Sequence, residues 1–193
     1  MVALGLLALP SIYRVTDDPL VERCAAGDLL AWQELHRQYY SVVRAFLRRL
    51  GIQERDVDDA CQEVFVRLHR SLGSFRGESE LKTWIYRVCV TEAGRLRRRL
   101  RAWEAARSVA AQDAEEPSVA EPELGDLMLK QRVEAALGRM SPGDRAAFVL
   151  YELEGLSGKD IAAVLGCPVA TVWRRLHYAR RAFGEEFGVE GTG

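Results

Sequence analysis

Long hydrophobic runs, an excess of basic charge and a signal sequence are all missing from this chain. No stretch reaches the roughly 18 apolar residues that a membrane-spanning helix needs, and the apolar start, MVALGLLALP, lacks the cationic region and cleavage site of a signal peptide. The formal net charge of −1 over 193 residues excludes a protein that coats nucleic acid by charge alone. We interpret the apolar leader as a disordered extension, a partner-binding tail or the product of an upstream start codon.

Groups that carry chemistry are also scarce. The four cysteines, Cys24, Cys61, Cys89 and Cys167, form no CxxC pair and no cluster with histidine. This argues against a metal site and predicts free thiols in a reducing cytoplasm. No nucleophile–base pair and no phosphate-binding loop is evident. We therefore predict a protein that is not an enzyme and that uses no cofactor.

Helical periodicity is present along most of the chain, without a convincing strand alternation. The pattern predicts an all-α protein of two small helical domains joined by an acidic flexible linker, the second a four-helix domain that ends in a helix-turn-helix. The predicted divisions are an N-terminal extension (1–17), a first domain (18–107), the linker (108–126), a second domain (127–187) and a tail (188–193).

Charge is segregated along the chain although the total is near zero. Residues 82–107 carry eight lysines and arginines against two glutamates, and residues 108–126 carry six acids and no cation. Two prolines and few large apolar side chains accompany these acids, which is typical of a flexible, self-repelling linker. The arginines before it can follow a nucleic-acid backbone.

The first domain is predicted to hold helices at 28–50, 56–70 and about 80–101, separated by Gly51 and a Gly/Ser-rich loop at 71–79. Helix 56–70 has an apolar stripe and an opposite face with acids early and arginines late. Residue types alone favour simple solvation matched to the helix dipole. The loop and the helix after it combine aromatic and cationic groups, which suits single-stranded nucleic acid.

The strongest local signal is SGKDIAAVLGCPVATVWRRLHYARRA, at residues 157–182. A capped helix, a turn at Gly166 and a second amphipathic helix are typical of a helix-turn-helix that docks in the major groove of DNA. The alternative is an ordinary helical hairpin with a solvated arginine face. The candidates for contact with bases or phosphates are Lys159, Ala170, Thr171, Trp173, Arg174, Arg175, His177, Tyr178 and Arg180.

Three segments resemble, in the correct order, the parts of an extracytoplasmic-function (ECF) sigma factor of the bacterial sigma superfamily: DVDDACQEVFVRLHR, SFRGESELKTWIYRV and LGRMSPGDRAAFVLYELEGLSGKDIAAVLGCPVATVWRRLHYAR. The resemblance implies a subunit that binds RNA polymerase core through its β and β′ subunits. Such a subunit recognises −35 and −10 promoter elements, promotes strand opening and then dissociates. The implied partners are promoter DNA, duplex at −35 and single-stranded at −10, and an anti-sigma factor, with no membrane insertion.

The resemblance assigns roles to three sets of residues. The implied polymerase-binding candidates are Asp59, Gln62, Glu63 and Arg67. The implied −10 candidates are Phe75, Arg76, Gly77, Glu78, Ser79, Arg95 and Arg98. The helix at 169–182 resembles the reader of the −35 element, which implies the DNA contacts named above.

The chain departs from the family pattern where DNA sequence is read. Family members commonly show Thr-Val-Lys-Ser-Arg where this chain has TVWRR at 171–175, and Tyr178 stands where arginine is frequent. In the melting helix, Thr91 replaces a common asparagine. No promoter sequence is therefore inferred from relatives. Two other classes stay open: a self-sufficient helix-turn-helix repressor or activator, which usually dimerises on a palindrome, and a decoy that sequesters a regulator.

Overall fold

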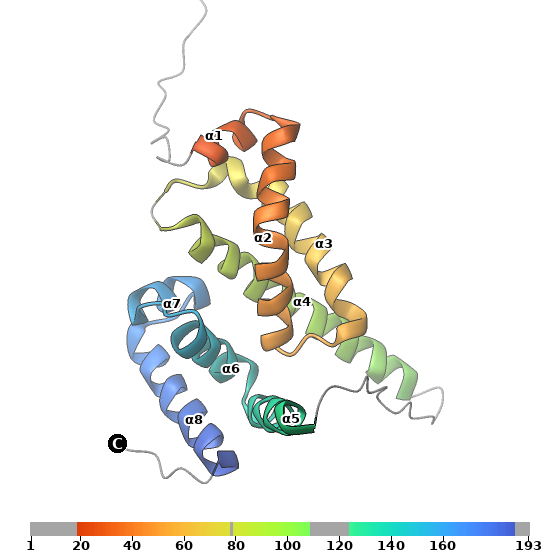
Figure 1. Cartoon of the computed structure of the whole chain (residues 1–193), viewed down its shortest axis with the longest axis vertical. Helices are drawn as coiled ribbons and strands as arrows, with labels where there is room; N and C mark the ends of the chain where they lie inside the picture. Colours follow the sequence, from red (N-terminus) through yellow and green to blue (C-terminus); the bar gives the residue numbers. More distant parts are fainter. Residues whose placement is uncertain (1–18, 78, 109–123, 188–193) are drawn as a thin grey trace, which may run out of the picture.

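The protein is described by a computed structural model that covers residues 19–77, 79–108 and 124–187. Within these ranges every regular element is helical (Figure 1), which confirms the all-α prediction. The elements are α1 (Pro19–Ala25), α2 (Leu29–Arg49), α3 (Glu54–Ser71), the short turn η1 (Leu72–Ser74), α4 (Leu81–Ser108), α5 (Leu124–Arg139), α6 (Pro142–Phe148), the π-helical turn η2 (Val149–Leu153), α7 (Gly158–Leu165) and α8 (Val169–Phe187).

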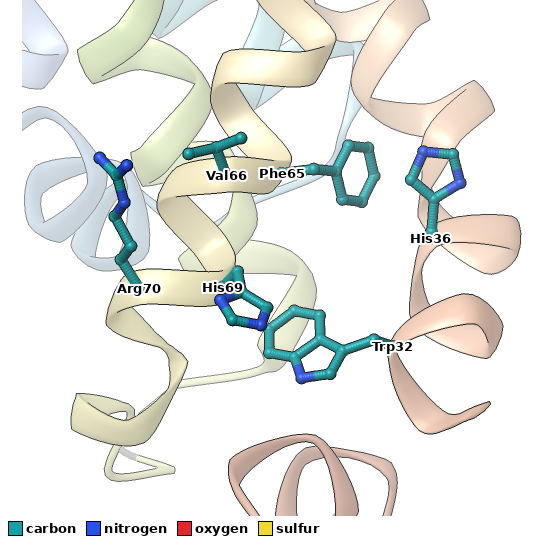
Figure 2. A pocket seen from close by; sticks show the side chains of 6 residues that line it. All are labelled: Trp32, His36, Phe65, Val66, His69 and Arg70. Carbon is teal, nitrogen blue, oxygen red and sulfur yellow. The ribbon is translucent and has the colours of Figure 1, made fainter. Parts of the chain in front are cut away.

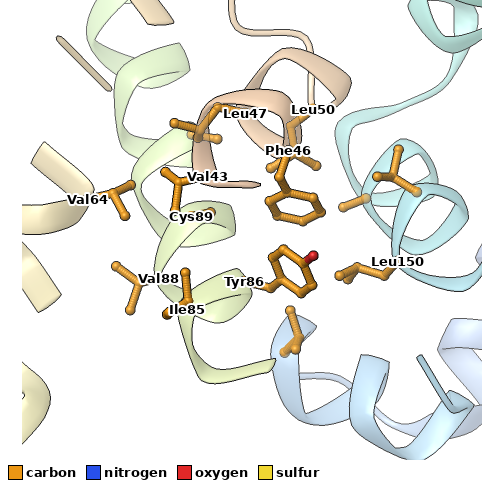
Figure 3. Close-up of a cluster of buried hydrophobic side chains, with 14 of the residues drawn as sticks. Val43, Phe46, Leu47, Leu50, Val64, Ile85, Tyr86, Val88, Cys89 and Leu150 are labelled. Atoms are coloured by element: carbon orange, nitrogen blue, oxygen red, sulfur yellow. The ribbon is translucent and has the colours of Figure 1, made fainter. Parts of the chain in front are cut away.

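Helices α1 to α4 form the first half of the molecule around a shared apolar core. Helix α2 begins where the Asp28 carboxylate accepts hydrogen bonds from the backbone N–H groups of Leu30 and Ala31, at 2.8 and 3.2 Å. It ends before Gly51, whose φ of 92° takes the chain out of the helix. Figure 3 shows the buried side chains that α2, α3 and α4 contribute: Val43, Phe46, Leu47, Val64, Ile85, Val88 and Cys89.

Helices α5 to α8 form the second half, in which serine caps fix two helix starts. The Ser141 hydroxyl accepts a hydrogen bond from the Asp144 backbone N–H, and the Ser157 hydroxyl accepts one from that of Asp160, each at 3.2 Å. Gly166 then turns the chain between α7 and α8 in the left-handed conformation, with φ 61° and ψ 41°. The predicted caps and turn are therefore present. The residues that anchor α8 by burial are Val172, Leu176 and Ala179.

The two halves share a continuous core. The rings of Phe46 in α2 and Tyr86 in α4 lie 4.3 Å apart, and Leu150 of η2 approaches them from the second half (Figure 3). All three side chains are buried. Burial of one large apolar side chain stabilises a fold by about 1.5–3 kcal/mol. These three side chains therefore stabilise the contact between the halves.

Two element boundaries differ from the sequence prediction. Helix α4 does not end near Arg101 but continues to Ser108, and α5 begins at Leu124, inside the segment predicted as linker. The first difference follows from residues 102–106, AWEAA, because alanine and glutamate have high helix propensity. The predicted leader, the predicted tail and linker residues 109–123 lie outside the described residues.

Candidate protein and nucleic-acid interfaces

One exposed face of α3 carries three of the four predicted polymerase-binding residues. Asp59, Gln62 and Glu63 are exposed and recur at the three- and four-residue spacing of a single helix face. Val66, one turn further along, continues this face and is 44% exposed. These four residues are called the α3 stripe below. Acidic groups next to an exposed apolar side chain suit a contact with another protein.

The fourth predicted residue, Arg67, follows Glu63 by one helical turn, but its side chain is engaged within the fold. Its guanidinium pairs with the carboxylate of Glu92 on α4, and Glu92 is only 7% exposed. Arg95 also approaches this carboxylate, at 3.3 Å. A buried carboxylate is costly without a cationic partner, so Arg67 holds α3 against α4. Arg67 therefore differs from the α3 stripe in having a partner inside the protein.

A groove of about 460 Å³ opens between α2 and α3 (Figure 2). Its rings meet across the two helices, with centroids 4.7 Å apart for Trp32 and His69 and 4.5 Å apart for His36 and Phe65. The other residues that line it are Val66 and Arg70. The groove is therefore continuous with the α3 stripe. The groove was not predicted from the sequence, although Val66, an apolar residue outside the buried spacing of α3, was a signal for it.

The predicted −10 loop follows η1 and leads into α4. Phe75 is half-buried, and its ring lies 5.3 Å from that of Trp84, so this aromatic group packs against α4. Arg76 and Gly77 are exposed, and Gly77 turns the chain with a φ of 67°. The loop thus presents an arginine beside a ring that is only partly covered.

The remaining −10 candidates differ in their burial and in their partners within the protein. Ser79 is half-buried, and Glu78 lies outside the described residues. Arg95 approaches the buried carboxylate of α4, whereas Arg98 is exposed. Between them, Arg97 donates a hydrogen bond to the carbonyl oxygen of residue 50, and burial lowers its pKa. The basic segment therefore mixes arginines that hold the fold with arginines that face solvent.

The helix-turn-helix consists of α7 and α8, and most of its predicted DNA contacts are exposed. The exposed candidates are Lys159, Ala170, Trp173, Arg174, His177, Tyr178 and Arg180, and the partly buried ones are Thr171 and Arg175. Arg180 already has partners in its own half: Nε donates to Glu152 at 2.8 Å, and the guanidinium lies 5.2 Å from the centre of the Tyr151 ring. The hydrogen bond to Glu152 raises the pKa of Arg180.

Both halves match a known family. The family profile described as Sigma-70 region 2 matches residues 35–108, and the one described as Sigma-70, region 4 matches residues 130–183. The ECF RNA polymerase sigma-E factor of Haemophilus influenzae is 35% identical over 176 residues, which cover 86% of this chain and 93% of that protein. The chain belongs to the ECF sigma factors.

Other relatives agree with this assignment. The sigma-E factor of Escherichia coli K12 is 36% identical over 180 residues, which cover 88% of this sigma factor and 93% of that protein. The RNA polymerase sigma-H factor of Pseudomonas aeruginosa is 35% identical over 179 residues, which cover 86% of this chain and 91% of that one. The family predicted from the sequence is thus confirmed, and this sigma factor is a protein of transcription initiation.

Two solved structures share the fold. CnrH, in complex with the cytosolic domain of CnrY, matches with a TM-score of 0.65 and 24% identity over 89% of this sigma factor and 97% of that chain. The sigma factor RpoE of Bartonella quintana, in complex with the anti-sigma factor NepR, matches with a TM-score of 0.64 and 24% identity over 82% of this chain and 98% of that one. Among the described residues, no helix has the length and apolar character needed to cross a bilayer.

Glu154 joins the two halves of this sigma factor. It follows η2, and its side chain is only 7% exposed. The carboxylate accepts a hydrogen bond from the Tyr86 hydroxyl and pairs with Arg49 at 2.6 Å and with Lys82 at 3.4 Å. Burial, and then the hydrogen bond to Glu154, raise the pKa of Tyr86, so the phenol keeps the proton that it donates. These four residues are called the Glu154 cluster.

Arg145 of α6 makes a second tie between the halves. Its Nε donates to the Arg49 carbonyl oxygen at 2.5 Å, at the C-terminal end of α2, where cations are favourable. The same guanidinium covers Gly51: a Cβ atom there would lie 2.8 Å from Nη1. Burial, followed by the charge of nearby Arg97, lowers the pKa of Arg145 to about 10. Arg145 of α6 and Arg97 of α4 thus both donate to backbone carbonyl oxygens at the end of α2.

Proposed function

We propose that this sigma factor is a dissociable initiation subunit, cytoplasmic and without catalytic activity of its own. The observation that carries the proposal is that one chain presents the α3 stripe on its first half and a helix-turn-helix with exposed cations on its second. A self-sufficient DNA-binding protein has no need of the first surface. The phosphodiester chemistry belongs to the polymerase, and this chain supplies the reading of the promoter.

The α3 stripe is the proposed docking surface for RNA polymerase core, with its β and β′ subunits as partners. Helix α8 enters the major groove of duplex DNA at −35. The loop around Phe75 and Arg76 takes up a base of the −10 element once the strands part, and this capture offsets an unstacking cost of a few kcal/mol. Divided in this way, the first domain is 18–107 and the second is 127–187, with the acidic segment between them.

Promoter geometry requires the two halves to separate. The −35 and −10 elements lie about 25 base pairs apart, or roughly 80 Å at about 34 Å for each helical turn of DNA. Helix α4, with its 28 residues, is the longest element and measures about 42 Å at 1.5 Å per residue. Two halves in direct contact therefore do not reach both elements together. Binding to polymerase and promoter must release the Glu154 cluster.

An anti-sigma factor is the remaining proposed partner. The support is that a similar fold, RpoE of Bartonella quintana, was solved with the anti-sigma factor NepR. The groove between α2 and α3, with its exposed histidines, partly buried aromatic rings and exposed Val66, is a surface that such a protein can cover. Covering it would also block the adjoining α3 stripe.

Run-off transcription tests the main proposal. Bacterial core polymerase is assayed with and without the full chain on fragments of the source genome. New discrete transcripts that share upstream elements are expected, and they would reveal the −35 and −10 sequences together. Failure to bind core polymerase would overturn the proposal. A tight sequence-specific complex with duplex DNA in the absence of polymerase would then favour a repressor, and binding to a regulator alone would favour a decoy.

A further inference from the structure

The four arginines of α8 belong to one basic helix, but they differ in whether they have a partner inside the protein. Three are held by partners inside the protein, and Arg174 is exposed with no partner among the described residues. We infer that α8 reads its element through two side chains: Arg174 binds one guanine, and the apolar surface around Trp173 contacts the methyl group of a thymine. The inference rests on the proposed −35 role of α8 and adds the chemistry that it recognises.

Arg175 is turned back into the domain. Its Nη1 lies 3.8 Å from Cys167 Sγ in the turn before α8. Its guanidinium also lies flat against the start of α6, where a Cβ atom on Gly143 would be 3.1 Å from the guanidinium carbon. A side chain at that position would press on the guanidinium. Arg175 therefore connects α8 to α6 and to the turn, which is the role of a residue that positions the reading helix.

The two later arginines are engaged as well. Arg180 pairs with Glu152 and lies over the Tyr151 ring, both in the element that precedes α7. Arg181 pairs with Glu185 at 3.1 Å, one turn further along the same helix. Both lie in the second half of α8, whereas a recognition helix places its N-terminal residues against the base edges. Neither is therefore the base-reading cation.

Trp173 supplies an apolar surface beside Arg174. One side of its indole is fixed, because a Cβ atom on Gly158 would lie 2.8 Å from Cζ2 and the Tyr151 ring stands edge-on at 5.6 Å. The rest of the side chain stays 46% exposed. Val169, one turn earlier, is 41% exposed, and Ala170 beside it is exposed as well. Together they make a rigid apolar patch on the part of α8 that enters the groove.

The chemistry of the major groove decides what these two surfaces recognise. A free guanidinium pairs with the O6 and N7 acceptors of guanine, and the thymine methyl is the apolar group that base pairs present there. Because Trp173 and Arg174 are adjacent on the helix, the guanine and the thymine lie within the same short stretch of the element. Lysine at position 174 would keep the positive charge but lose the planar fork that fits both acceptors of guanine.

Base analogues test this division directly. The full chain, bound to core polymerase, is used to select a duplex from a random-sequence pool. If the chain does not bind polymerase, the selection is made with the chain alone. Each guanine is then replaced in turn by 7-deazaguanine, which lacks N7, and each thymine by uracil, which lacks the methyl group. One guanine position is expected to weaken binding by about 5-fold or more, and one nearby thymine position by a smaller, measurable factor.

Matched variants assign each effect to a residue. In Arg174→Ala the 7-deazaguanine effect should vanish, and in Arg174→Lys it should shrink while most of the salt dependence is kept. In Trp173→Ala the uracil effect should vanish. Arg175→Ala and the exposed control Arg181→Ala should keep both analogue effects, and Arg175→Ala should lower the thermal stability. Comparing analogue and parent DNA within each variant removes any effect of altered stability.

Four results would overturn the inference: a 7-deazaguanine effect that survives in Arg174→Ala, a uracil effect that survives in Trp173→Ala, analogue effects that disappear in Arg175→Ala, or no sensitivity to either analogue. In each case promoter-directed transcription by the unmodified holoenzyme would leave the proposed function intact. A chain that binds no DNA sequence selectively, with or without polymerase, would overturn both.

Discussion

The hydroxyl of Tyr86, in the longest helix of the first half, donates a hydrogen bond to the carboxylate of Glu154 in the second half. Arg49 and Lys82 bring two positive charges to the same carboxylate. The contact therefore depends on one buried acid that receives three groups from the first half. In the proposed function promoter binding separates the halves, so the strength of this cluster would set part of the cost of opening.

Replacing Glu154 by glutamine should loosen the contact between the halves. Loss of the charge leaves Tyr86 and two cations with a weaker acceptor, and a poorly satisfied buried polar group costs about 1–3 kcal/mol. Single-molecule energy transfer between dyes on α2 and α8 should show a larger open fraction. Glu152→Gln is the matched control, because Glu152 pairs within the second half. An equal open fraction in both variants would show that Glu154 does not hold the halves together.

Replacing Asp59 and Glu63 by alanine should weaken binding to core polymerase without changing stability, because both side chains are exposed on the α3 stripe. Arg67→Ala should instead lower the folding stability. It leaves the buried Glu92 with Arg95 alone, which we expect to cost about 1–3 kcal/mol. Competition for core polymerase and thermal unfolding separate the two effects. If the Asp59/Glu63 variant competes as well as wild type, the α3 stripe is not the docking surface.

Two glycines with similar backbone geometry test the role of Arg145. Gly27 and Gly51 have φ values of 85° and 92°, but only Gly51 has a neighbour at the position of a Cβ atom, the Arg145 guanidinium. Gly27→Ala should cost about 1 kcal/mol, from backbone strain alone. Gly51→Ala should cost more and also increase the open fraction, since it displaces Arg145 from the end of α2. Equal losses of stability in chemical unfolding would contradict the proposed tie.

Alkaline pH should destabilise the fold through its buried thiols. Burial raises the pKa of Cys61 from 9.0 to about 11 and also raises that of Cys89. The unfolded chain therefore loses these protons first, and folding stability should fall as pH rises from 9 towards 11. Unfolding by urea at pH 8 and pH 10 measures the change. Cys61→Ala should reduce this pH dependence whatever its effect on stability at pH 8; an unchanged dependence would show that Cys61 does not contribute.

Much of the local structure was predictable because it depends on residues close together in the sequence. The caps at Ser141 and Ser157 and the turn at Gly166 each involve neighbours within a few positions, and apolar spacing identified the buried faces of α3 and α8. The same local signals, in the right order, carried the family assignment. The element boundaries that were wrong lie in alanine-rich or acidic segments without a clear stop signal, where helix propensity alone decides.

Only the tertiary structure shows which charged side chains form ion pairs inside the protein and which remain free. The family resemblance grouped Arg67 with Glu63, and the residue pattern of the last helix grouped Arg175 with Arg174. Neither shows which distant residue a side chain contacts. Arg67 meets a buried acid 25 positions away, and Glu154 meets Arg49 across 105 positions. A charge buried by such a distant contact must be paired or pay a large desolvation cost. Only the packing of one helix on another therefore separates the arginines that hold this sigma factor together from those left free to bind.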